Sequence, residues 1–129
     1  MSDTIHKGGN MKLSQAEALA LSLNSMLNTK GVAGLKIARN LRMINDELKE
    51  YYERKQELFR KYGEEKGDQL VVDKDSENYP LFIKELEPLA NEEVEFNFRK
   101  LTENDLAESG LTAGQMGLLW DWMVQTDEQ

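Results

Sequence analysis

The stretch VAGLKIARNLRMINDELKEYYERKQELFRKY, residues 32–62, decides the fold of this chain. It contains no proline, and its apolar residues recur at the spacing of one helix face. That face consists of Ile37, Leu41, Ile44, Leu48, Tyr51, Leu58 and Tyr62, interrupted by Lys55. A helix of about 30 residues is about 45 Å long. The sequence therefore predicts one long amphipathic helix that needs partners along its whole length.

A shorter helix is predicted before the long one. Ser14 and Glu17 have the spacing of a capping box, and an apolar stripe follows them. This helix is about half as long as the next one, so as an antiparallel hairpin it covers only the first half of the long helix. The second half is left for the C-terminal part of the chain or for a second chain, and Lys55 in the apolar face is compatible with a homodimer.

Two strands and a helix are predicted next. Val94, Phe96 and Phe98 alternate with polar residues, which indicates a strand over 93–101 with one apolar face. Residues 69–72 are a second strand candidate after a charged turn at 63–68. Between them Pro80 is placed to begin a helix, and Pro88 should bend or stop it.

The C-terminal region predicts two short helices. Thr102 with Asp105 and Thr112 with Gln115 repeat the capping pattern. The expected fold class is thus mostly α (α+β): a helical hairpin with one long helix, a small two-stranded sheet and short C-terminal helices. Residues 1–12 are expected to be a disordered N-terminal arm, 13–125 a single α-rich domain, and 126–129 a frayed tail.

The composition excludes several classes of functional site but does not identify a function. The chain has 129 residues, no cysteine and one histidine, His6, which lies in the predicted arm. Disulfides, thiol nucleophiles and multi-histidine metal sites are therefore excluded, and a reducing compartment, the cytoplasm, is expected. No segment predicts a membrane span, and the first ten residues lack the apolar stretch of a signal peptide.

Charge is unevenly distributed along the chain. Residues 1–62 hold 11 Lys and Arg against 7 Asp and Glu, a net +4, whereas residues 63–129 hold 5 against 17, a net -12. The acidic half repels phosphate, which makes the whole chain a poor general nucleic-acid binder.

The order of these segments resembles a known family. MKLSQAEALALSLNSML, GLKIARNLRMINDELKEYYERKQELFRKYGE, FIKELEPLANEEVEF and LTAGQMGLLWDWM follow one another as in a family of small uncharacterised proteins encoded by tailed phages and prophages. The similarity covers about residues 11–123, and the segment before Met11 departs from it. The resemblance implies a phage context, with host cytoplasm or the virion as locations. It supplies no catalytic residue.

Five residues are candidate partner contacts. Lys36, Arg39 and Arg42 form a basic stretch at the start of the long helix, with Met43 beside them. The functional interpretation is binding to phosphate or to an acidic partner surface; the alternative is pairing with the chain's own acidic half, or plain solvation. Trp122 is the fifth candidate.

The two tryptophans of the last helix are expected to face different ways. Trp120 falls on the predicted apolar stripe with Leu119 and Met123, which leaves Trp122 partly exposed. An exposed tryptophan is typical of binding hot spots. The alternative is that Trp122 helps to close the uncovered end of the long helix.

Two acidic groups are weak candidates for chemistry. The loop that starts at Asp73 resembles half of a calcium loop, but Asn78 and Lys84 stand where glycine and glutamate are needed. The carboxylates of Glu92, Glu93 and Glu95 lack a shielded pocket and are better explained as protection of an edge strand. No catalytic, metal or cofactor residue is predicted.

The sequence therefore favours a non-enzymatic protein that acts through protein–protein contact. It would be a minor assembly or accessory factor, or a modulator of a host protein. One alternative is an acidic nucleic-acid mimic that inhibits a host nucleic-acid enzyme. The net charge of -12 on residues 63–129 motivates this alternative. Another is a small DNA-binding protein that uses the basic start of the long helix.

Overall fold

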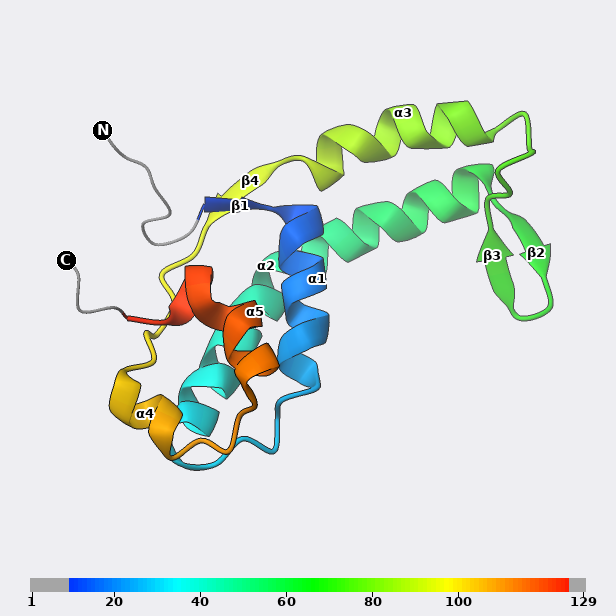
Figure 1. Cartoon of the computed structure of the whole chain (residues 1–129). Helices are drawn as coiled ribbons and strands as arrows, with labels where there is room; N and C mark the ends of the chain where they lie inside the picture. Colours follow the sequence, from blue (N-terminus) through cyan, green and yellow to red (C-terminus); the bar gives the residue numbers. More distant parts are fainter. Residues whose placement is uncertain (1–9, 126–129) are drawn as a thin grey trace.

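A computed structural model of the chain describes residues 10–125. This part of the chain forms five helices and four short strands (Figure 1). In order they are β1 (Asn10–Lys12), α1 (Leu13–Asn24), α2 (Gly31–Tyr62), β2 (Glu64–Lys66), β3 (Gln69–Val71), α3 (Tyr79–Ala90), β4 (Glu93–Glu95), α4 (Glu103–Ala107) and α5 (Ala113–Met123). None of these helices is long and apolar enough to cross a membrane.

The long helix is confirmed. It spans Gly31–Tyr62, and α1 packs against it as the predicted hairpin, with contacts that reach as far as Lys55. Ile37, Ile44 and Leu48 are completely buried on the face that the periodicity marked. One continuous core joins this face to α1, to the chain after β4 and to α5.

The second half of α2 is covered by the chain itself. Helix α3 runs beside it, so the two helices extend together away from the core (Figure 1). The rings of Phe59 and Phe82 meet with 5.1 Å between their centroids, and Leu58 is buried beside them. Tyr62 and Lys61 both bind the carboxylate of Glu85. The sequence left open whether a C-terminal segment of the chain or a second chain covers this half. In the structure it is covered by α3 of the same chain.

The sheets differ from the prediction. The two expected strands do not pair with each other; each belongs to its own two-stranded antiparallel sheet. β3 pairs with β2, which lies inside the segment predicted as a turn, and the turn itself is formed at Gly67, whose φ of 65° favours glycine. β4 pairs with β1, so residues 10–12 are part of the fold and not of a disordered arm.

Met11 explains why the predicted arm was too long. Its side chain is buried in the core and faces Val94 across the sheet. A three-residue strand carries almost no sequence signal of its own, because its pairing partner lies far along the chain. Residues 1–9 and 126–129, including His6, lie outside the described residues.

The predicted strand over 93–101 is regular only at Glu93–Glu95. Its apolar face is confirmed, because Phe96 and Phe98 are buried and stacked on each other. Beyond residue 95 no strand of the described chain lies alongside to continue the ladder. The side chain of Asn40 takes that place: its Oδ1 accepts from the Arg99 N–H at 2.8 Å, and its Nδ2 donates to the Arg99 carbonyl at 3.0 Å.

The helix starts follow their capping signals at two of three places. Thr102 with Asp105 and Thr112 with Gln115 form reciprocal capping boxes on α4 and α5. The α1 prediction was shifted, because Ser14 lies inside the helix and the Gln15 side chain accepts from the Lys12 N–H instead.

The prolines of α3 behave nearly as expected. Pro80 lies in the first turn, and the helix passes Pro88 and ends two residues later at Ala90. A proline this close to a helix end disturbs few hydrogen bonds.

Candidate protein-binding surface

The basic start of α2 is partly used inside the molecule. Lys36 Nζ lies 2.6 Å from Asp105 Oδ2 and 2.8 Å from the Lys100 carbonyl oxygen. The Lys36 ammonium, together with the backbone N–H of Thr102, holds the pKa of the Asp105 carboxyl below its ordinary value. Lys36 therefore fixes α4 against α2, which is the alternative of pairing with the chain's own acidic half and not the contact with an external partner.

The other three predicted contact residues on α2 differ in how far they are exposed. Arg39 and Arg42 are exposed. Met43 is partly buried and packs against the core. Of the four predicted contacts on α2, only the two arginines have largely exposed side chains. The buried face of the helix is wider than the seven apolar residues predicted from the sequence, and it includes Met43.

The assignment of the two tryptophans was wrong. Trp120 is 47% exposed, whereas Trp122 is partly buried against the core. Leu119 and Met123 are fully buried, and Met123 Sδ accepts from Asn40 Nδ2 at 3.2 Å. On a helix wheel Trp122 flanks this buried pair on one side and Trp120 on the other. The neighbouring elements cover only the Trp122 flank, and no sequence pattern distinguishes the two flanks.

The exposed flank of α5 is the surface that sequence reasoning missed. Leu118 is 55% exposed too, but it lies about 160° around the helix from Trp120, because residues two apart do not share a helix face. The helix that carries them is held rigidly by its capping box and by its buried face. Large apolar side chains on a fixed element are a surface suited to protein contact.

Lys55 does not need a second chain. Its ammonium lies 3.0 Å from Glu17 Oε2 on α1 and 5.1 Å from the centroid of the Tyr51 ring. Burial and the neighbouring Glu17 carboxylate raise the pKa of Tyr51 to about 12. Glu17, predicted as a capping residue, thus joins α1 to the middle of α2.

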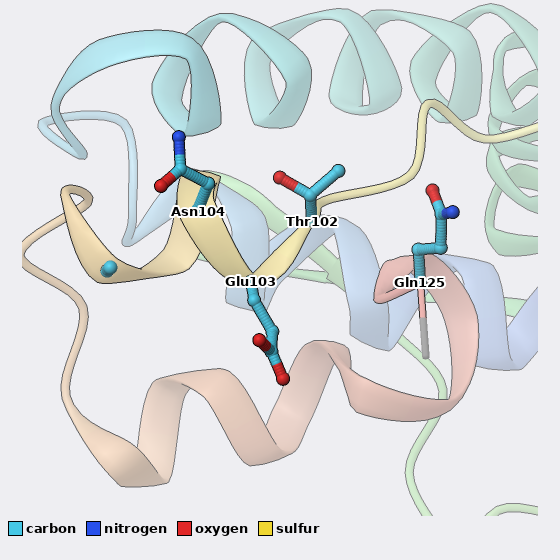
Figure 2. Close-up of a pocket in the computed structure, with 5 residues that line it drawn as sticks. Thr102, Glu103, Asn104 and Gln125 are labelled. Carbon is cyan, nitrogen blue, oxygen red and sulfur yellow. The ribbon is translucent and has the colours of Figure 1, made fainter. Parts of the chain in front are cut away.

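A hollow beside α4 is lined by polar side chains that point in different directions. Its volume is about 480 Å³, and it is lined by Thr102, Glu103, Asn104, Ala107 and Gln125. Figure 2 shows the Glu103 side chain on the opposite side of the ribbon from Thr102 and Asn104. Thr102 Oγ1 is already engaged as a helix cap. The groups therefore do not converge as a catalytic or binding constellation requires.

The acidic segment after α2 resembles a metal loop only in composition. Asp73 forms an ion pair with Lys66 at 3.2 Å, and this bond lowers the pKa of Asp73. Within residues 10–125, no group of three Asp, Glu or His side chains is arranged to hold a metal ion. Glu93 and Glu95 are exposed on β4.

Comparison with known proteins adds no relative. No protein-family model, no curated protein and no solved structure matches the chain. The phage context therefore rests on the segment order described above and stays a prediction.

Proposed function

We propose that the chain is a non-enzymatic binding protein that acts through protein–protein contact in the cytoplasm of a host cell. Its role would be that of a phage or prophage accessory or assembly factor, or of a modulator of a host protein. The phage part of this proposal comes from the resemblance alone.

The exposed apolar pair on α5 carries the proposal. Leu118 and Trp120 remain half-exposed although the same helix buries Leu119 and Met123 completely. Leaving about half of each side chain in water forgoes about 1 kcal/mol of burial free energy per residue. A partner protein that wraps around the outward half of α5 would cover both side chains and recover that energy.

An acidic mimic of nucleic acid is the second candidate. Glu64, Asp73, Asp75 and Glu77 gather around a shallow hollow of about 410 Å³ after α2. Such a surface would bind a basic protein cleft, and its affinity would fall steeply with salt. Contact through Leu118 and Trp120 would persist at high salt.

The test is affinity capture with the immobilised full-length chain, compared with a Leu118→Ser/Trp120→Ala variant. The matched control is Leu81→Ser, which changes a leucine of similar exposure on α3. We expect a protein that is retained at high salt by the wild-type chain and by the control, and lost by the double variant. Direct titration with that protein after purification completes the test.

Two outcomes would reject the α5 surface. Capture that is unchanged by the double variant removes the role of Leu118 and Trp120. Release of the captured protein by salt, with loss of binding after Asp73→Lys/Asp75→Lys, would instead favour the acidic mimic.

A further inference from the structure

The outward side of α2 is covered by no other element of the described chain. Its residues are exposed from the first turns to the last and carry mostly charged groups. We call it the α2 outer face, made of Leu35, Arg39, Arg42, Asp46, Lys49, Glu53, Glu57 and Arg60. They recur at intervals of three and four, so they lie on one stripe about 40 Å long.

The charged groups of this face have no partner within the described chain. Among residues 10–125, none of them forms an ion pair or a side-chain hydrogen bond. Charges of α2 just beside the face differ: Arg54 pairs with Glu50, and Lys61 pairs with Glu85. Apart from Glu47, the unpaired charges of α2 in the described chain all lie on the stripe.

The charges of the stripe are arranged symmetrically with opposite signs, so that a positive residue on one side of the middle corresponds to a negative residue on the other side. Arg42 and Glu53 are equally far from the middle of the stripe, the point between residues 47 and 48, and they have opposite signs. Asp46 and Lys49 have the same relation to that point. Arg39 and Glu57, also of opposite sign, are equally far from that point to within one residue.

Two copies of such a face match when they run antiparallel. A twofold axis through the middle brings each cation of one copy beside an anion of the other, and symmetry makes every pair twice. A parallel arrangement in register would bring identical charges together instead. We propose that the α2 outer face binds a second copy of this chain, antiparallel and through a twofold axis near residues 47 and 48.

The apolar end of the stripe fits the same arrangement. Leu35 is 50% exposed, and it lies as far from the middle as Arg60. In the antiparallel pair the aliphatic stem of Arg60 covers Leu35 of the other copy. Exposed ion pairs are individually weak, so this dimer is expected to be weak and sensitive to salt.

Sedimentation velocity of the full-length chain at increasing protein concentration is the first test. We expect a dimer in about 0.05 M salt that dissociates in about 0.5 M salt, where exposed charges are screened. A chain that stays monomeric at low salt, or a dimer that is indifferent to salt, overturns the proposal.

Charge exchange tests the pairing. Arg42→Glu and Glu53→Arg each place like charges together and should raise the dissociation constant about tenfold. The double variant restores opposite charges and should recover dimerisation. Lys84→Glu and Glu87→Arg, the same changes on exposed α3 positions, are the controls and should change nothing. If the double variant associates no better than the single ones, the proposed pairing is wrong.

Cross-linking tests the direction. Because the chain has no cysteine, Leu35→Cys and Arg60→Cys each introduce a unique thiol. When the two variants are mixed, an antiparallel pair forms the disulfide between them faster than either variant forms a disulfide with itself. Faster self-linking would indicate a parallel pair and overturn the proposal. Since Leu118 and Trp120 lie outside the α2 outer face, their variant should still dimerise, so this inference and the proposed function fail separately.

Discussion

The two halves of α2 are packed in different ways. The first half lies in a body formed by β1, α1 and the chain from β4 to α5, which bury it from several sides. The second half lies in an arm with α3 and the β2–β3 hairpin (Figure 1). One helix thus belongs to a thick core at one end and to a thin two-helix layer at the other.

This difference teaches where stability is located. The outward stripe of α2 is exposed along both halves, but in the body several elements bury the opposite face, as Ile44 and Leu48 show. In the arm that face is covered mainly by α3. We expect changes in the body to affect the whole molecule and changes in the arm to act locally.

The largest expected effect is in the body. Ile44→Ala removes a fully buried side chain and leaves a cavity, which should lower the free energy of unfolding by about 3–4 kcal/mol. Ile83→Ala, the same change at a partly buried position of the arm, should cost about 1 kcal/mol. Urea denaturation measures both, and equal losses would remove the distinction between body and arm.

The next effect should be confined to the arm. Phe82→Ala removes the ring that meets Phe59 and should destabilise the contact between α3 and α2 by about 2–3 kcal/mol. Hydrogen exchange should accelerate in α3 while α1 keeps its protection. Leu81→Ala, at the exposed neighbouring position, is the control. Acceleration throughout the chain would show that body and arm unfold as one unit.

A polar link within the body comes third. Asn40→Ala removes the two hydrogen bonds to the Arg99 backbone and leaves those groups unsatisfied, at a cost of about 2 kcal/mol. Asn45→Ala, at an exposed position of the same helix, should have almost no effect. Thermal unfolding of the two variants checks the difference. Because alanine has the higher helix propensity at both positions, a similar result for the two variants would mean that the Asn40 hydrogen bonds contribute no measurable stability.

The smallest effect depends on pH. The folded state lowers the pKa of Asp105, so its bond to Lys36 stabilises the fold above about pH 4 and is lost as the pH falls through the folded-state pKa. Asp105→Asn should cost about 1 kcal/mol at neutral pH and flatten the acid end of the stability curve. Glu103→Gln, an exposed change on the same helix, should leave the curve unaltered. Unfolding by urea at several pH values measures this.

Periodicity was sufficient for the parts of the fold that depend on local signals. The hairpin of α1 and α2, the caps at Thr102 and Thr112, and the buried face of Phe96 and Phe98 all follow from residues close together in the chain. Strand pairing was not predictable, because Met11 finds Val94 only through the folded body.

The candidate contacts were harder to predict than the fold. Lys36 has the same sequence character as Arg39, and only the position of Asp105 separates a structural ion pair from an exposed cation. Trp120 and Trp122 flank one buried face, and the rotation of α5 that chooses between them is set by distant contacts. Local sequence carries neither kind of information.

The segment 93–101 receives both ends of the described chain. β1 pairs with its start, and Leu101 forms a parallel bridge with Val124 at its end. During synthesis α1 and α2 leave the ribosome before β4 and α5, whose residues complete their core. At about 5–20 residues per second, the hairpin waits several seconds with its apolar face open. Nascent chains of this protein should therefore depend on chaperones until α5 and Val124 have been made.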